Sequence, residues 1–325
     1  MSPASPYTKP TFCTLPTQSL TCWKFLANNQ KGTVMKIGFI GLGNLGFVIA
    51  ENLLATRQPL YVYNRTAAKA QPLIEKGAIS CTSVKELSAQ CDIVFSIVSD
   101  DAALKEITDG PDGIAAHLKK EGIHVSMSTI LPVTATTLTA VHRQQGNIYI
   151  ACPLLARPDA AKARKINFLV AGEEQAIKTI KPLLQEAGGI NVWEYGREES
   201  AANVAKLASN YLILTAMSAL SESINMTKRS NIEVDTWFNM ITQTIFNAPV
   251  YINYGKHILS EAFQPALFGL SLGLKDMNLV LEQAATVKAA MPLGAEVRSL
   301  LQESKDAGLG DHDVTAVALT IQQKQ

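Results

Sequence analysis

Residues 35–46, MKIGFIGLGNLG, decide the fold of this 325-residue chain. The short apolar run 35–40 leads directly into a turn that fits the pattern G-x-G-x-x-G, and helical spacing follows over residues 44–55. In such a strand–turn–helix unit the first glycine permits the tight turn, the second lets the backbone approach a pyrophosphate, and the third lets helix and strand pack closely. The N-terminus of the helix also faces the negative phosphates. Against the alternative of a plain glycine-rich turn, the pattern predicts a dinucleotide site formed by Gly41, Leu42, Gly43, Asn44, Leu45 and Gly46.

The residues after the second predicted strand, 60–63, indicate which dinucleotide is bound. Folds that bind NAD usually carry Asp or Glu here for the ribose hydroxyls, whereas this chain reads Asn64-Arg65-Thr66. An acid would repel the extra phosphate of NADP, but a guanidinium binds it through two hydrogen bonds and a hydroxyl adds another. We therefore expect Asn64, Arg65 and Thr66 to bind NADP (NADPH). The alternative is that Arg65 only begins a surface helix.

Strands and helices alternate as far as residue 196. Apolar runs predict further strands at 92–98, 123–128, 147–151 and 166–171, and helical spacing predicts helices at 67–76, 134–144 and 173–187. This alternation is typical of the α/β class, here a Rossmann-type doubly wound parallel sheet covered by helices on both faces. The runs 92–98 and 166–170 are apolar without alternation, which predicts central parallel strands. Where the first of these ends, we expect the backbone of Val98 to touch the cofactor and Asp100 or Asp101 to cap the next helix.

The second half of the chain predicts helices only. Residues 200–227 contain no Pro or Gly and form one predicted helix about 40 Å long. Further helices are expected at 233–244, 250–259, 272–288, 294–305 and 314–322. We therefore expect an NADP-binding Rossmann domain over residues 35–198 and an all-helical substrate and dimerisation domain over residues 199–325. Residues 1–34 contain no Asp, Glu or Arg and show no helical period; they predict a disordered or poorly anchored extension, or an upstream start, with targeting as the alternative.

Composition argues against several classes of protein. The net charge is +1, so nothing favours nucleic acid, and no apolar stretch reaches 18 residues, so no membrane span is expected. The five cysteines include no C-x-x-C pair, which indicates reduced thiols in the cytoplasm and no zinc site. No metal is expected. The partner is a small-molecule substrate, and the apolar helical half favours a homodimer or homotetramer.

A lysine on the long helix stands out as a candidate for acid–base chemistry. Ala202, Lys206 and Asn210 are spaced i, i+4, i+8 and so share one face of the helix. Burial would lower the pKa of Lys206 and let it shuttle a proton at neutral pH. The alternative is a lysine whose stem packs while its ammonium reaches solvent.

Five motifs follow one another along residues 35–318: the glycine turn, Asn64-Arg65-Thr66, Ser128-Thr129-Ile130-Leu131-Pro132, the helix of Lys206 and Asn210, and Lys275-Asp276-Met277. In these motifs and their order the chain resembles the β-hydroxyacid dehydrogenase family. That family includes 3-hydroxyisobutyrate dehydrogenases and glyoxylate/succinic semialdehyde reductases. The resemblance implies that Lys206 protonates the carbonyl oxygen, that Asn210 orients the substrate, and that Ser128 and Thr129 lie near nicotinamide and substrate. It further implies that Lys275 reaches back to the cofactor side of the cleft, while Asp276 holds its helix in place.

One segment departs from the family. Where relatives usually read D-x-P-V-S-G-G, whose small residues and backbone amides receive the substrate carboxylate, residues 151–157 read ACPLLAR and keep only the proline. Arg157 either binds a carboxylate directly or is a solvated loop residue. The sequence thus predicts an NADP-dependent oxidoreductase that interconverts a small hydroxy acid and its aldehyde or oxo acid. The alternatives are an imine reductase-like enzyme and a non-catalytic NADP-binding protein.

Overall fold

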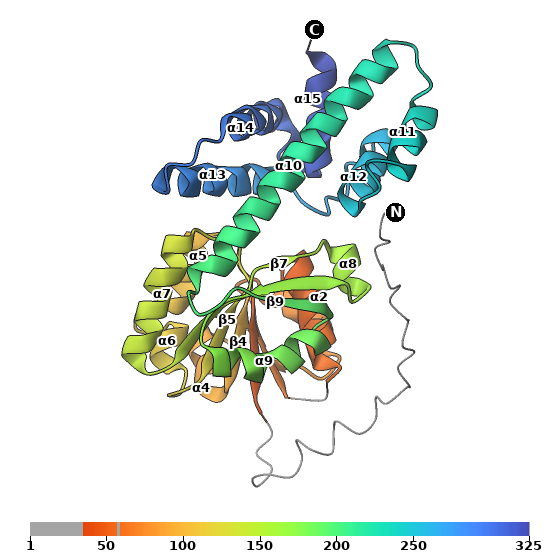
Figure 1. Ribbon diagram of the computed structural model, residues 1–325. Coiled ribbons are helices and arrows are strands. Elements are labelled where there is room, and N and C mark those ends of the chain that lie inside the picture. The colour runs from red at the N-terminus through yellow and green to blue at the C-terminus, as the bar shows by residue number, and fades with distance from the viewer. Residues whose placement is uncertain (1–34, 57–58, 325) are drawn as a thin grey trace, which may run out of the picture. The chain divides into compact units, whose positions relative to one another are not determined.

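A computed structural model describes residues 35–56 and 59–324 (Figure 1). The extension predicted at residues 1–34 lies outside the described residues. Over the two described ranges, every helix is too short or too polar to cross a membrane.

The main sheet has six parallel strands in the order β3-β2-β1-β4-β5-β6. Their bounds are Ile37–Ile40 (β1), Leu60–Tyr63 (β2), Ile79–Ser80 (β3), Ile93–Ser96 (β4), Ile123–Ser126 (β5) and Ile148–Ala151 (β6). The first strand, β1, lies in the middle of the sheet. Strands β2 and β3 follow on one side of β1, and the chain then crosses over to β4 on the other side. Ligands of such sheets bind at the carboxyl ends of the strands where the order reverses. The glycine turn after β1 and the Val98 loop after β4 both lie at that point, which confirms the Rossmann prediction.

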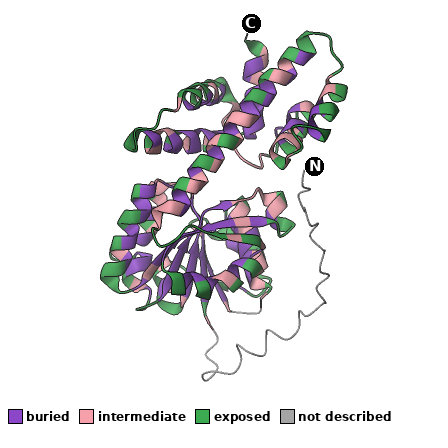
Figure 2. Ribbon diagram, viewed as in Figure 1, coloured by how far each residue is buried: buried purple, intermediate pink, exposed green. Residues whose placement is uncertain are grey.

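The strands of the main sheet are mostly buried (Figure 2), and their side chains alternate between two core clusters on opposite faces. In register across the sheet, Phe39, Phe95, Val125 and Ile150 point to one face. Helices α2 (Asn44–Leu54) and α9 (Glu174–Glu186) pack on that face. The opposite face is covered by α4 (Val84–Gln90), α5 (Asp101–Thr108), α6 (Ile114–His117) and α7 (Pro132–Gln145).

The strand at 166–170 corrects one prediction. It forms β8 (Ile166–Val170), but β8 is not a central strand of the parallel sheet: it belongs to a second sheet of order β7-β8-β9. It runs antiparallel to β7 (Leu154–Leu155) and parallel to β9 (Gly189–Glu194), and a single antiparallel bridge, Ala151 to Ala171, connects it with the end of β6. Its side chains other than Asn167 are apolar and buried on both faces of the strand, and that burial carries no information about strand direction.

From Ser200 onward the described chain is helical, as predicted. Helix α10 (Ser200–Arg229) has 30 residues and is about 45 Å long. Its first turns pack against β6, β8 and α7, and its later turns enter a second core with the helices that follow it (Figure 1). Those helices are α11 (Val234–Gln243), α12 (Pro249–Ser260), α13 (Leu270–Thr286), α14 (Pro292–Ser304) and α15 (Val317–Gln323). Helix α10 therefore belongs to both cores.

Candidate active site

The glycine turn has the shape that a pyrophosphate site needs. Gly41 has a φ of +96°, and a Cβ there would lie 2.1 Å from the carbonyl oxygen of Ile97, so only glycine fits. A Cβ on Gly46 would lie 2.1 Å from the carbonyl oxygen of Gly41, because helix and strand pack closely at this point. At Gly43, by contrast, no atom of the described residues other than Gly43 and its two chain neighbours lies within 4 Å of the Cβ position. The N-terminus of α2, which starts at Asn44 and continues through Leu45, has no side-chain cap, so its backbone N–H groups are open to an anion.

Asn64 supports this turn from the end of β2. Its Oδ1 accepts a hydrogen bond from the Leu42 N–H at 2.8 Å, and its Nδ2 donates to the Thr66 carbonyl at 2.9 Å. Arg65 and Thr66 are exposed, and Arg65 forms no ion pair with any residue that the structure describes. The side chain of Asn64 thus orders the turn, while the guanidinium of Arg65 remains available to a phosphate.

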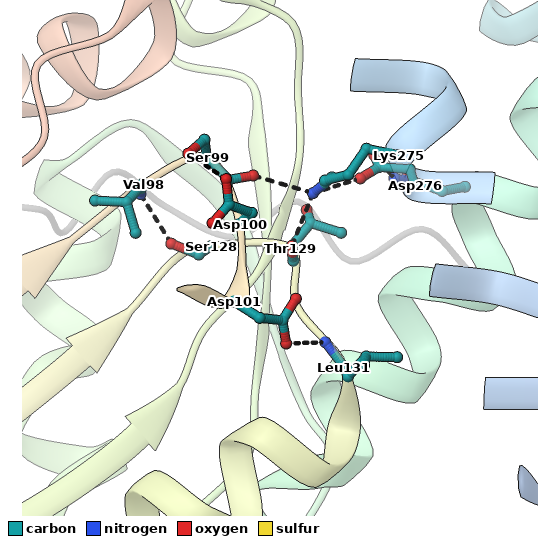
Figure 3. A network of polar contacts seen from close by, with 10 residues as sticks. Val98, Ser99, Asp100, Asp101, Ser128, Thr129, Leu131, Lys275 and Asp276 are labelled. Carbon is teal, nitrogen blue, oxygen red and sulfur yellow. Dashed lines mark hydrogen bonds and ion pairs between the residues drawn. The ribbon is translucent and has the colours of Figure 1, made fainter. Parts of the chain in front are cut away.

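Ser128 joins the loops that follow β4 and β5. Its Oγ accepts a hydrogen bond from the Val98 N–H at 2.8 Å, and only 1% of Ser128 is exposed (Figure 3). Asp100 caps α5 by accepting from the Ala103 N–H at 2.9 Å, as predicted. Asp101 binds the Leu131 N–H at 3.0 Å, a contact between the two loops that the sequence did not predict.

Lys275 connects α13 with both loops. Its Nζ donates to the carbonyl oxygens of Ser99, at 3.2 Å, and Thr129, at 2.9 Å (Figure 3). The same ammonium pairs with Asp276 Oδ1 at 2.8 Å. Lys275 therefore holds the helical core against the loops that follow β4 and β5.

Lys206 and Asn210 lie on α10 near this lysine and aspartate. Asn210 is buried, and its Nδ2 donates to Asp276 Oδ2 at 2.6 Å. Lys206 is partly buried, and its burial lowers the pKa of the ammonium from 10.5 to about 8; the negative charge of Asp276 opposes this change, and the positive charge of Lys275 adds to it. The fall in pKa that burial was expected to cause is thus present. The ammonium groups of Lys206 and Lys275 share this end of the sheet with the carboxylates of Asp276 and Asp100.

Arg157 is not a solvated loop residue. Its side chain is 16% exposed, its Nη2 donates to Asp159 Oδ2 at 3.2 Å, and its Cζ lies 5.3 Å from the centre of the Tyr254 ring. Tyr254 belongs to α12, so this contact also joins the two cores. No sequence motif predicts the contact of Tyr254 with Arg157 or that of Asp101 with Leu131, because these residues meet only in the tertiary fold.

Comparison with known proteins adds to this geometry. A profile of the NAD-binding domain of 6-phosphogluconate dehydrogenase matches residues 36–196, and one of NADP-dependent 3-hydroxyisobutyrate dehydrogenase matches residues 200–321. The oxidoreductase YfjR of Bacillus subtilis is 38% identical over 87% of this chain and 98% of its own length. The chain belongs to the β-hydroxyacid dehydrogenase family.

Two further proteins are similar to this chain. The chloroplastic glyoxylate/succinic semialdehyde reductase 2 of Arabidopsis thaliana is 27% identical over 89% of this chain and 80% of its own length. A solved structure of Psf3 with NADP+ and 2-OPP is 25% identical, with a TM-score of 0.80 over 88% of this chain and 99% of that one. As a β-hydroxyacid dehydrogenase, the protein is an oxidoreductase that binds a nicotinamide dinucleotide and acts on CH–OH groups. The roles of its individual site residues stay predictions.

Proposed function

We propose that this protein is an NADP-dependent reductase of a small aldehyde or 2-oxo acid. In the reverse direction it oxidises the matching hydroxy acid. The observation that carries the proposal is Lys206: an ammonium with a pKa of about 8, on the same helical face as Asn210 and under the influence of Asp276 and Lys275. A general acid works best when its pKa lies near the operating pH. An ordinary lysine would hold its proton too firmly for this task.

Lys206 supplies the proton of the reaction. A bound NADPH delivers hydride to the carbonyl carbon when it is present. Lys206 donates its proton to the carbonyl oxygen, which becomes the hydroxyl group. At pH 7 about nine in ten Lys206 side chains carry that proton, given a pKa of about 8. In the reverse direction the neutral amine of Lys206 accepts the hydroxyl proton.

The neighbours of Lys206 hold it in place and set its charge. Asp276 of α13 accepts a hydrogen bond from Asn210 of α10 at 2.6 Å, which fixes the register of the two helices, and it pairs with Lys275 on its own helix at 2.8 Å. Asn210 orients the substrate from the next turn of α10. Ser128 positions the loop of Val98 beside the cofactor through its hydrogen bond at 2.8 Å.

The preference for NADP over NAD rests on the end of β2. Arg65 is exposed there and no carboxylate stands in the position that NAD-binding folds reserve for the ribose. The relative Psf3, whose structure contains NADP+, supports the same preference.

Consumption of NADPH by the full chain tests the proposal. Small aldehydes bearing a carboxylate, 2-oxo acids and cyclic imines are offered in turn, each with NADPH and with NADH, and absorbance at 340 nm is followed. We expect turnover of at least one carbonyl acid, faster with NADPH than with NADH, and none of the imines. Turnover of imines alone, or binding of NADPH with no turnover of any compound, would contradict the proposal.

A further inference from the structure

A chain of hydrogen bonds runs through the core between the main sheet and α7. Its four side chains are at most 4% exposed: Ser96, His124, His142 and Asn147. Ser96 Oγ lies 2.8 Å from His124 Nε2, and His124 Nδ1 lies 2.9 Å from His142 Nε2. The other ring nitrogen of His142, Nδ1, lies 2.5 Å from Asn147 Oδ1. The chain thus connects β4, β5, α7 and the start of β6 through side chains alone.

The amide of Asn147 fixes the direction of every hydrogen bond in this chain. Its Nδ2 donates to two carbonyl oxygens in and just after α6, at 2.8 and 3.0 Å, so its Oδ1 accepts from His142 Nδ1. A neutral imidazole carries one proton, so His142 Nε2 is bare and accepts from His124 Nδ1. His124 Nε2 is bare in turn and accepts from the Ser96 hydroxyl. Both rings are therefore fixed as the tautomer with its proton on Nδ1.

Burial keeps both imidazoles neutral. It lowers the pKa of His142 from 6.5 to about 4, although the hydrogen bond to Asn147 opposes this change. It also lowers the pKa of His124 well below 6.5, and the charge of His142 adds to that effect. The ring of Tyr149 packs against both imidazoles, and burial raises the pKa of its hydroxyl, so that group is neutral too. At physiological pH the chain therefore keeps a single arrangement of protons.

Ser96 ends β4, next to the residue that touches the glycine turn. That residue, Ile97, lies so close to Gly41 that a Cβ there would approach the Ile97 carbonyl oxygen to 2.1 Å. The Cβ position of Gly46 lies 2.6 Å from Ile97 Cγ2. Ile97 thus packs against the first and third glycines of the turn that faces the pyrophosphate. Because these contacts leave no free space, the position of Ser96 decides where the turn lies.

We propose that His124 is a positioning residue for the cofactor: by accepting from the Ser96 hydroxyl it fixes the end of β4 against the glycine turn, and so raises the affinity for the dinucleotide. His124 acts through Ser96 and Ile97. Without its acceptor the Ser96 hydroxyl would be buried and unpaired, which costs enough free energy to favour a shift of the strand end. The inference depends on the dinucleotide binding of the family, and on neither Lys206 nor the substrate.

Ser96→Ala tests this link, because it removes the donor and frees the end of β4 from His124. Ser88→Ala is the matched control: Ser88 of α4 is fully buried, and no described residue forms a hydrogen bond with its hydroxyl. The Kd of NADPH and of NADH is measured by fluorescence titration, and the free energy of unfolding by urea titration. For the dinucleotide that the wild type binds more tightly, we expect Ser96→Ala to raise the Kd at least ~5-fold. Ser88→Ala should leave that Kd unchanged.

A purely structural chain would give a different result. Ser96→Ala would then lower the free energy of unfolding and leave the Kd of both dinucleotides unchanged, which would overturn the proposal. A wild type that binds neither dinucleotide would overturn it as well. Binding without turnover of any carbonyl compound would refute only the proposed function, and weaker binding by Ser96→Ala would still support the role of His124.

Nitrogen NMR of the wild type, with isotope-labelled histidine, applies even if Ser96→Ala fails to fold. At neutral pH the spectra should show a protonated Nδ1 and a bare Nε2 for both His124 and His142; a proton on either Nε2 would overturn the proposal. Coupling between two sites is reciprocal, so a bound dinucleotide should in turn shift the Nε2 resonance of His124. His117 at the end of α6 serves as the reference and should not shift. A His124 resonance that stays in place when the protein is saturated with dinucleotide would overturn the proposal.

Discussion

Carbonyl reduction should depend on pH in a way that reflects Lys206. Burial is the main cause that lowers the pKa of this lysine from 10.5 to about 8. That difference corresponds to roughly 3 kcal/mol against the charged form. At pH 9 about one Lys206 in ten is still protonated, whereas a lysine with its ordinary pKa would be almost fully protonated. Because only the protonated form donates, kcat for reduction should fall about tenfold for each pH unit above 8.

The assay follows kcat at saturating NADPH and substrate from about pH 6 to about pH 10. Deuterated NADPH shows at each pH whether hydride transfer limits the rate. Oxidation of the hydroxy acid needs the neutral amine, so its rate should rise about tenfold for each pH unit below 8 and level off above pH 8, where reduction begins to fall. A reduction rate that stays flat to pH 10 while hydride transfer is limiting would refute either the low pKa or the role of Lys206.

Asp276→Asn provides the control for that profile. The carboxylate of Asp276 raises the pKa of Lys206 against the effect of burial. Its removal should therefore lower that pKa further, and the fall in kcat should begin about one pH unit earlier. A profile that does not move would mean that another group controls the pH dependence.

Two further predictions concern the cofactor and the core. Arg65→Asp should weaken NADPH binding by about 2 kcal/mol in a fluorescence titration and spare NADH, because a charge-assisted contact becomes repulsion; equal losses for both cofactors would make Arg65 structural. Acidification should reduce the free energy of unfolding, measured by urea titration, because burial lowers the pKa of His124 and lowers that of His142 from 6.5 to about 4. Below pH 6.5 the unfolded chain binds a proton at His142 that the folded chain does not bind. The contribution of His142 to stability is therefore complete above that pH, and roughly 3 kcal/mol of it is lost by pH 4. If the free energy of unfolding of His142→Gln falls with pH as steeply as that of the wild type, other groups cause the loss of stability.

Most of the fold could be predicted from local sequence patterns. The glycine turn could be predicted because each glycine meets a constraint set within one strand–turn–helix unit, as the contacts of Gly41 and Gly46 show. Lys206 and Asn210 could be placed on one face because a helical period needs no tertiary information. The strand at 166–170 could be predicted but its sheet could not, since a mostly buried apolar strand has the same sequence pattern in either sheet.

Contacts between distant segments could not be predicted from the sequence. Lys275 meets Ser99 and Thr129 across more than 140 positions of sequence, and Arg157 meets Tyr254 only because α12 folds back toward β7. Short helices such as α6 (Ile114–His117) were also missed, because four residues are too few to show a helical period. Strand β9 was missed for a different reason: most of its side chains are exposed, so it lacks the apolar run of its neighbours.

A single-turnover measurement on Lys206 variants tests the assignment of the proton donor most directly. Enzyme loaded with NADPH is mixed with excess carbonyl acid, and the loss of NADPH absorbance is followed by stopped flow, with NADPH affinity measured separately. Lys206→Ala should slow hydride transfer at least ~10²-fold while NADPH still binds. Lys206→Arg should be almost as slow, because a guanidinium keeps its charge but does not release a proton near neutral pH. If Lys206→Arg instead retains most of the wild-type rate, Lys206 only attracts the anionic substrate, and it is not the proton donor.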